Sequence, residues 1–144
     1  MPYTIRKLRN DDFPEMEEMF SIVFPPKEKG LKTRFKYRIQ NLSKGICLES
    51  GELAGFVLCD VYGDDFEHIK IDYIVIHPAY QRLGLGTVLL EHVLGLCKKM
   101  KKNVTLIPVM RDHVIQWYRK KGFQISRIAD AKGGGKLYEM TYQA

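Results

Sequence analysis

One stretch of the chain joins an apolar strand to a helix through a glycine-containing turn. The run Tyr73-Ile74-Val75-Ile76 is apolar on both faces, as expected for a central strand of a sheet. A loop follows, and then a helix whose start contains Gly84 and Gly86. Glycine lets a ligand approach the backbone, and the first N–H groups of a helix lack partners and carry partial positive charge. The stretch predicts a seat for phosphate or pyrophosphate, to which Gln81 and Arg82 add donors.

The glycine turn does not match the two common nucleotide-binding motifs. A Walker loop requires Gly-Lys followed by Ser or Thr, and a dinucleotide fingerprint requires GxGxxG with an acidic residue about 20 positions later. The chain has only GxG at this point. Taken alone, such a pair of glycines more often serves a tight strand-to-helix turn than a ligand.

Length and composition predict a single soluble domain over residues 1–144. Of the 144 residues, 45% are hydrophobic and 28% charged, so the chain can bury a core without disulfides or metal. No apolar run approaches the roughly 18–20 residues that span a bilayer, and the N-terminus lacks the apolar core of a signal peptide. We therefore expect no membrane association.

Cysteine and histidine usage favours a reducing compartment and no metal site. Cys47, Cys59 and Cys97 form no CxxC pair and lie in apolar runs, where a free thiol behaves as a small hydrophobe. The four histidines do not stand at ligand spacing from them. The expected location is cytoplasmic.

Hydrophobic periodicity predicts a mixed α/β fold built on one sheet. The expected strands cover residues 3–8, 46–49, 53–62, 67–77, 104–109, 123–128 and 137–142, and the expected helices cover residues 13–23, 31–42, 85–100 and 112–121. Asp112 is expected to cap the last helix and Gly122 to end it. The last strand is a candidate sheet edge, which leaves a homodimer open.

The net charge of +6 predicts attraction to an anionic partner, but the charge is unevenly distributed. Basic runs from Lys27 to Arg38 and from Lys98 to Lys102 are either solvated helix faces or partner surfaces. They contain no interleaved exposed aromatics, which disfavours nucleic acid as a partner. The segment from Asp60 to Glu67 instead holds four acids and no base.

Two motifs together resemble the GCN5-related N-acetyltransferase (GNAT) superfamily. Gln81-x-x-Gly84-x-Gly86 after an apolar strand is similar to its motif A, and Trp117-Tyr118 followed by Gly122-Phe123 is similar to its motif B. The resemblance extends over nearly the whole chain. It implies a central, mostly antiparallel sheet, splayed at the fourth and fifth strands and flanked by about four helices.

The resemblance implies acetyl-CoA as co-substrate, and no metal. The backbone of three strand residues would pair with the pantetheine arm: Ile74, Val75 and Ile76. The N–H groups of the following turn would hold the pyrophosphate beside Gln81: Arg82, Leu83, Gly84, Leu85, Gly86 and Thr87. Arg111 stands where family members often carry a cofactor-binding asparagine, so its role is open.

The resemblance also implies direct transfer of an acetyl group to an amine. Tyr118 matches the family tyrosine that protonates the departing thiolate, a role that suits a phenol. Asp72 interrupts an apolar strand and is the first candidate for the base that deprotonates the amine, with a structural pair as an equal alternative. Glu67, His68, Tyr73 or a chain of waters are further candidates for the base.

The acceptor is the least constrained part of the prediction. In the family, the loop between the third and fourth strands borders the acceptor side, so the acids from Asp60 to Glu67 favour a small cationic amine such as a polyamine. The alternatives are a protein N-terminal or lysine acetyltransferase and a non-catalytic acyl-CoA-binding sensor. A solvated turn explains the same acids without any acceptor.

Overall fold

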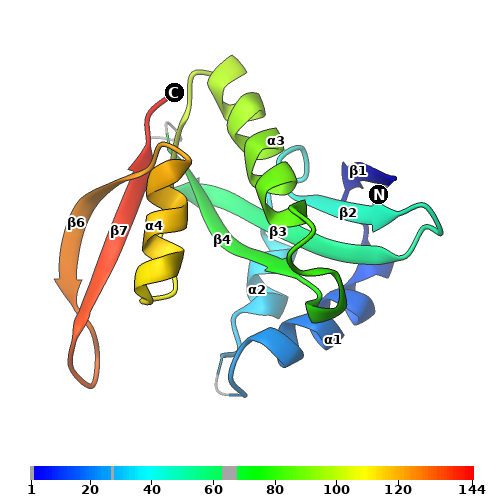
Figure 1. The fold of residues 1–144 in the computed structure, drawn as a ribbon, viewed down its shortest axis with the longest axis horizontal. Coiled ribbons are helices and arrows are strands. Elements are labelled where there is room, and N and C mark those ends of the chain that lie inside the picture. Colours follow the sequence, from blue (N-terminus) through cyan, green and yellow to red (C-terminus); the bar gives the residue numbers. More distant parts are fainter. Residues whose placement is uncertain (1, 27, 63–67) are drawn as a thin grey trace. The chain divides into compact units, whose positions relative to one another are not determined.

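The computed structural model describes residues 2–26, 28–62 and 68–144. Figure 1 shows its strands and helices. In chain order they are β1 (Tyr3–Lys7), the 3₁₀ helix η1 (Asn10–Asp12), α1 (Phe13–Val23), α2 (Leu31–Lys36), β2 (Lys44–Leu48), β3 (Leu53–Tyr62), β4 (His68–Ile76), the 3₁₀ helix η2 (Pro78–Tyr80), α3 (Leu85–Lys99), β5 (Asn103–Leu106), α4 (Asp112–Lys120), β6 (Gln124–Asp130) and β7 (Lys136–Tyr142).

The strands form one mixed sheet in the order β1-β2-β3-β4-β5-β7-β6, which confirms the predicted fold class. The chain divides into two compact units: an N-terminal unit of residues 1–60 and 71–96, and a C-terminal unit of residues 61–70 and 97–144. The prediction of a single domain over residues 1–144 stays a prediction. No helix within the described ranges is long and apolar enough to cross a membrane.

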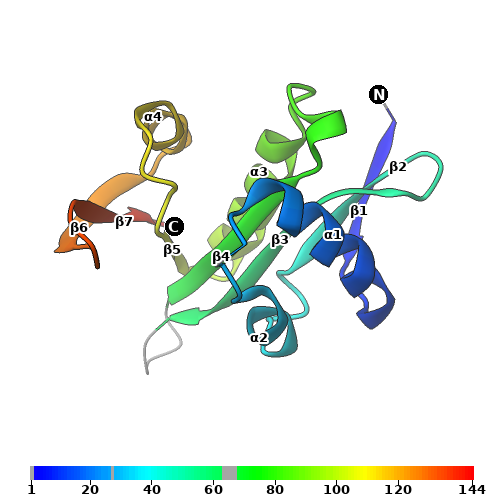
Figure 2. The ribbon, with the colours of Figure 1, turned by 90° about the horizontal axis from the view of Figure 1, so that it is seen from below.

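The N-terminal unit packs α1 and α2 on one face of its strands and α3 on the other (Figure 2). β1 pairs antiparallel with β2, and β2 with β3. The core under α1 and α2 contains buried residues at helical spacing on α1 and inward-facing residues of the strands. They include Met16, Phe20, Phe35, Phe56 and Val75.

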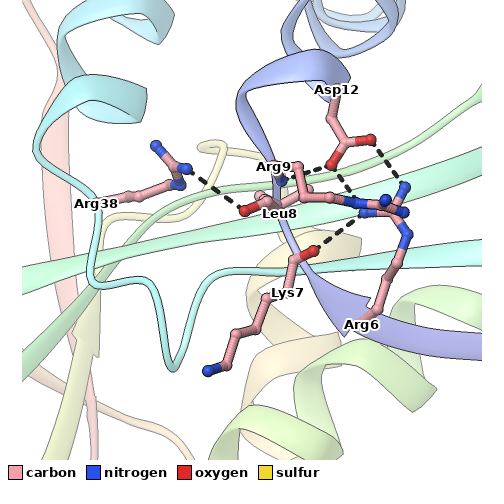
Figure 3. Close-up of polar contacts among 6 residues, drawn as sticks. All are labelled: Arg6, Lys7, Leu8, Arg9, Asp12 and Arg38. Atoms are coloured by element: carbon pink, nitrogen blue, oxygen red, sulfur yellow. Dashed lines mark hydrogen bonds and ion pairs between the residues drawn. The ribbon is translucent and has the colours of Figure 1, made fainter.

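An arginine–carboxylate network fixes the turn between β1 and α1 (Figure 3). Arg6 donates two hydrogen bonds of 2.8 Å to the two carboxylate oxygens of Asp12. The backbone N–H of Arg9 donates a third to Asp12, at 2.6 Å. Burial pushes the pKa of Asp12 up, but the bonds from Arg6 and Arg9 outweigh it and leave the pKa below its usual value. Asp12 therefore binds the strand to the helix as a carboxylate.

The second helix is shorter than the predicted range of residues 31–42. α2 ends at Lys36, and the chain then turns, with the N–H groups of Leu42 and Ser43 both donating to the Ile39 carbonyl. Arg38 lies 3.9 Å from the centre of the Phe35 ring and donates to the Phe35 carbonyl at 2.8 Å, so its side chain occupies the end of the helix. Leu42 lies beyond the end of the helix but is buried, which explains why it follows the same spacing of apolar residues.

The C-terminal unit begins with a parallel pair. Residues His68–Lys70 of β4 lie opposite Asn103–Thr105 of β5. β7 pairs antiparallel with β5 on one side and with β6 on the other. The prediction that residues 137–142 form a sheet edge is therefore wrong, because both sides of β7 are hydrogen-bonded and the edge strand is β6.

The last helix has the predicted extent but not the predicted cap. α4 runs from Asp112 to Lys120, with Arg111 in the N-cap position and no side-chain cap. Asp112 is the first helical residue, where its charge suits the positive end of the helix dipole. Gly122 has a φ of 101°, the left-handed conformation expected after a helix end.

Candidate active site

The turn between β4 and α3 has the geometry that the glycine pattern predicts. Arg82 and Gly84 both adopt left-handed backbone conformations, with φ of 68° and 78°. A non-glycine residue in this region is strained, so the fold retains the conformation of Arg82 against a local cost. In α3, the first N–H groups have no acceptor one turn earlier. The turn therefore presents backbone donors to an anion, as a pyrophosphate seat requires.

Hydrogen bonds hold this turn on the end of β4. The side-chain amide of Gln81 donates to the Ile76 carbonyl at 3.0 Å, and the backbone N–H of His77 donates to the Ala54 carbonyl of β3 at 2.8 Å. The Tyr80 hydroxyl donates to Glu52 at 3.3 Å. The Gln81 amide thus supports the turn, and the prediction that it also adds a donor for phosphate stays a prediction.

The sequence-predicted cofactor residues of this segment are close together in the N-terminal unit. Val75 and Leu85 are buried and support the segment from the core. The side chain of Leu83 is 49% exposed, and Gln81, Arg82 and Gly84 are exposed as well. Ile74, Ile76, Gly86 and Thr87 are partly buried. The exposed residues lie in the turn and the buried ones in the strand and helix, as a rigid support for a surface ligand requires.

Asp72 forms an ion pair. Its carboxylate lies 3.8 Å from the guanidinium of Arg34 on α2, and its side chain is only 3% exposed. Of the two readings of Asp72, catalytic base and structural pair, this contact favours the pair, because the guanidinium competes with any proton for the carboxylate.

A second carboxylate lies near the next residue of β4, and the sequence did not single it out. The Tyr73 hydroxyl donates to Glu28 Oε1 at 2.9 Å. Burial first, and this hydrogen bond second, raise the pKa of Tyr73 to about 12. Tyr73 is therefore a stable donor and a poor candidate for a base. The sequence does distinguish Glu28, because it is the one acidic residue in the basic run from Lys27 to Arg38.

Tyr118 is buried in the C-terminal unit. Its ring packs edge-on against Trp117 and Phe123, at centroid distances of 4.9 and 5.5 Å. Burial raises the pKa of Tyr118 to about 12. The phenol is therefore protonated throughout the neutral range, which is the state that an acid needs.

Of the remaining predicted residues, Arg111 and His68 are described and Glu67 is not. Arg111 is exposed in the C-terminal unit, and its carbonyl accepts hydrogen bonds from Val114 and Ile115 at the start of α4. His68 begins β4 and is partly buried. Glu67 and most of the acidic segment from Asp60 onward lie outside the described residues.

The chain has a mixed sheet with a left-handed turn between a central strand and a long helix, as the glycine motif predicted. The chain belongs to the acetyltransferase (GNAT) family, whose model matches residues 3–123. The match spans both predicted motifs and confirms the resemblance stated from them.

Individual relatives agree with the family. The chain is 26% identical over 141 residues to an uncharacterized N-acetyltransferase of Methanocaldococcus jannaschii, covering 88% of this chain and 62% of that protein. It is 34% identical over 92 residues to the N-alpha-acetyltransferase 50 of Danio rerio, covering 54% of this chain and 55% of that protein. The chain thus spans less than two thirds of these relatives.

Solved structures share the fold. Naa50 of Arabidopsis thaliana, in complex with the bisubstrate analogue CoA-Ac-MVNAL, superposes with a TM-score of 0.81 at 17% identity, covering all of both chains. Ard1 of Thermoplasma volcanium superposes with a TM-score of 0.85 at 18% identity, covering 100% of this chain and 99% of that one.

Proposed function

We propose that this protein is an N-acetyltransferase that moves the acetyl group of acetyl-CoA to a primary amine. The observation that carries the proposal is the turn from Gln81 to Gly84, which is held on β4 by hydrogen bonds and is left-handed at Arg82 and Gly84. Such a turn fits a pyrophosphate, because its backbone donors are oriented before the ligand arrives. Membership of the family supplies the chemistry.

In this proposal, the turn and β4 bind acetyl-CoA. The N–H groups from Arg82 to Thr87 bind the pyrophosphate, and the backbone of Ile74, Val75 and Ile76 binds the pantetheine arm. Arg111 is a further candidate for a phosphate contact. Acetyl-CoA supplies a thioester, whose carbonyl carbon is open to attack by an amine.

The transfer itself is direct. As the amine nitrogen bonds to the acetyl carbon, the carbon–sulfur bond breaks, the amine loses a proton and the sulfur gains one. Tyr118 holds a proton at its phenol oxygen and donates a hydrogen bond to the sulfur that becomes negative. Asp72 stays the first side-chain candidate for the base. Water is the alternative, and the ion pair between Asp72 and Arg34 favours it.

The acceptor that the structure supports best is the α-amino group of a peptide. Next to Glu28, the ring of Tyr73 packs on the buried Phe20 and on the partly buried Phe24. Ile22 and Val23 add exposed apolar surface at the end of α1. One carboxylate beside apolar surface suits a single ammonium attached to an apolar side chain. The relatives include the N-alpha-acetyltransferase 50 of Danio rerio, and the structures that share the fold include Naa50 of Arabidopsis thaliana.

A small polyamine is the second candidate, because four acids occur between Asp60 and Glu67. A polyamine carries several positive charges and needs several carboxylates. A lysine side chain is a third acceptor of the same chemistry. These candidates differ in which amine they offer, so one panel distinguishes them.

The test is release of CoA thiol from acetyl-CoA with three kinds of amine. The panel contains a peptide with a free N-terminal Met, the same peptide with a blocked N-terminus and one lysine, and spermidine. We expect turnover with the first peptide and the acetyl group on its α-nitrogen by mass spectrometry. Faster turnover with spermidine would favour the polyamine instead. Tight binding of acetyl-CoA without turnover on any amine would identify an acyl-CoA sensor.

A further inference from the structure

β6 is a free edge of the sheet in the C-terminal unit. It comes last in the sheet order, so among the described residues only β7 pairs with it. The strand is exposed from Ser126 to Asp130 and contains no proline, a residue that blocks pairing at an edge. Ile128 is 58% exposed, the highest value of any large aliphatic residue in the part of the chain that the structure describes. An exposed edge with an apolar side chain is a template for another strand.

The charged residues of β6 would not repel another strand, because β7 neutralises them. Arg127 lies 3.6 Å from Glu139, and Asp130 forms an ion pair with Lys136. In the register of the two strands, the residues of each pair lie directly opposite each other. Charges on an edge strand discourage pairing by repulsion, and these two ion pairs leave no excess charge of either sign along β6.

The other edge of the sheet, β1, is already engaged at its end. The Arg6 guanidinium donates to the Lys7 carbonyl at 3.0 Å, and its two bonds to Asp12 hold it there. A backbone acceptor at the end of β1 therefore has a partner within the chain. Of the two edges, β6 is the better surface for a further strand.

The hydrogen bonds of the hairpin show which residues of β6 direct their backbone outward. The Ala131 N–H donates to the Gly135 carbonyl at 3.1 Å, and this pair continues the register in which Asp130 lies opposite Lys136. In an antiparallel ladder, every second residue directs its N–H and C=O to the neighbouring strand, and the residues between direct theirs away. Counting back from Ala131, Asp130 and Ile128 direct their backbone groups away from β7.

Two β6 strands can pair these outward residues around a two-fold axis in three registers, of which one is favourable. With Asp130 opposite its own copy, two carboxylates would face each other. With Asp130 opposite Ile128, each carboxylate would lose water to an apolar side chain. With Ile128 opposite its own copy, the two exposed isoleucines cover each other. That register also puts the long Arg127 side chain opposite the small Ala129, and Asp130 opposite the small, polar Ser126.

The favourable register also extends an apolar patch across the two copies. Tyr138 lies opposite Ile128 on β7, so the two side chains are on the same face of the sheet. Tyr138 is partly buried within its own chain. Around a two-fold axis at Ile128, the Tyr138 and Ile128 side chains of one copy continue into those of the second copy. The pairing therefore buries apolar surface as well as backbone groups.

We propose that the protein forms a symmetric homodimer in which β6 pairs antiparallel with β6 of a second copy, with Ile128 on the two-fold axis. The two seven-stranded sheets then form one continuous sheet. The outward N–H and C=O groups of Ile128 and Asp130 gain partners in it. This inference rests on the C-terminal unit alone and does not depend on the proposed function.

The first experiment measures the dimer and its dependence on Ile128. Sedimentation equilibrium of the full chain from about 1 to about 500 μM should show a mass that rises toward twice that of one chain. Ile128→Lys places two ammonium groups opposite each other and should raise the dissociation constant of the dimer about 10-fold or more. Ile22→Lys is the matched control, because Ile22 is 54% exposed on α1, and it should leave the dissociation constant unchanged. Circular dichroism checks that both variants are folded.

The second experiment tests the register by disulfide cross-linking. The three native cysteines are buried, so a cysteine introduced on β6 supplies the exposed thiol. In the proposed register the two Cα atoms at position 128 lie about 5.5 Å apart, within the range of a disulfide, and those at position 129 lie about 8 Å apart, outside it. Under oxidised glutathione, Ile128→Cys should therefore form a covalent dimer, and Ala129→Cys should form at least about 5-fold less of it.

The outcomes separate the dimer from its register. A wild type that stays monomeric across the concentration series overturns the proposal, and so does a dimer that Ile128→Lys leaves as stable as before, because it would use another surface. Preferential cross-linking of Ala129→Cys overturns the register, since position 129 meets its own copy only when Ile128 lies opposite Asp130. A weaker dimer in Ile128→Lys together with cross-linking at position 128 supports the pairing of the two edges. Neither experiment measures activity, so the result is independent of the proposed function.

Discussion

The side-chain amide of Gln81 and the carbonyl of Ile76 form a hydrogen bond of 3.0 Å that holds the glycine turn against the end of β4. Gln81 directly precedes Arg82, the first of the two left-handed residues of the turn. The amide thus stabilises the strained part of the turn from within the N-terminal unit.

Loss of this hydrogen bond should weaken the binding of acetyl-CoA more than the binding of the amine. Gln81→Met keeps the size of the side chain and removes the donor, so we expect the KM for acetyl-CoA to rise about 2- to 10-fold. The amine KM should stay the same, since the change lies in the turn that is proposed to bind acetyl-CoA. Steady-state kinetics with each substrate varied in turn checks this. Gln116→Met, an exposed change on α4, serves as control. Equal rises in both KM values would contradict the assignment.

Ionisation of Tyr118 should not lower kcat at any pH below about 11. The acid must be protonated to act, and burial raises its pKa to about 12, so the active form persists as the pH rises. We expect kcat to level off between pH 8 and about 10 in the wild type. Tyr118→Phe should lower kcat by about 10-fold or more at every pH in this range. A descending limb in the wild type that is absent from the variant would show that the phenol titrates earlier.

Asp12 should contribute to stability at neutral pH and lose that contribution in acid. Its pKa in the folded state lies below the usual value of 3.8, so its contribution is present above that value and is lost as the pH falls through the folded-state pKa. Asp12→Asn should lower the free energy of unfolding by roughly 1–3 kcal/mol at pH 7, because Arg6 loses its partner. The difference from wild type should shrink below about pH 4.

Urea denaturation at a series of pH values measures this directly. Asp11→Asn, an exposed neighbour in the same 3₁₀ helix, should change the free energy of unfolding by less than about 0.5 kcal/mol. A difference between wild type and Asp12→Asn that is constant with pH would exclude the charged form as its source.

Two glycines should respond to alanine in opposite directions. At Gly55 a Cβ atom would lie 2.6 Å from the Val75 carbonyl oxygen and 3.2 Å from the Ile76 Cα, and backbone cannot move aside as a side chain can. Gly55→Ala should therefore destabilise the protein by more than about 2 kcal/mol. At Gly95, inside α3, a Cβ atom meets nothing within 4 Å, so Gly95→Ala should stabilise it by about 0.5–1 kcal/mol. Thermal unfolding of both variants tests the pair.

Sequence pattern alone located most elements of the fold because they depend on residues close together in the chain. The extent of α3 follows from apolar residues three or four positions apart, and the end of α4 follows from the glycine directly after it. The second helix was overestimated for the same reason, since Leu42 obeys the period although it lies beyond the helix end at Lys36. Asp112 was misplaced by one position, because capping depends on backbone angles that a sequence does not show.

What the sequence determined by itself is the family and the glycine turn: both follow from the spacing between Gln81 and Gly86 and from the motif at Tyr118. Only the tertiary structure decided which charges meet. Glu28 and Tyr73 lie 45 positions apart, and Arg34 and Asp72 are similarly distant, so no local pattern could pair them. Packing of α1 and α2 on the sheet brings these residues together, and it gives one acid in a basic segment its place beside β4.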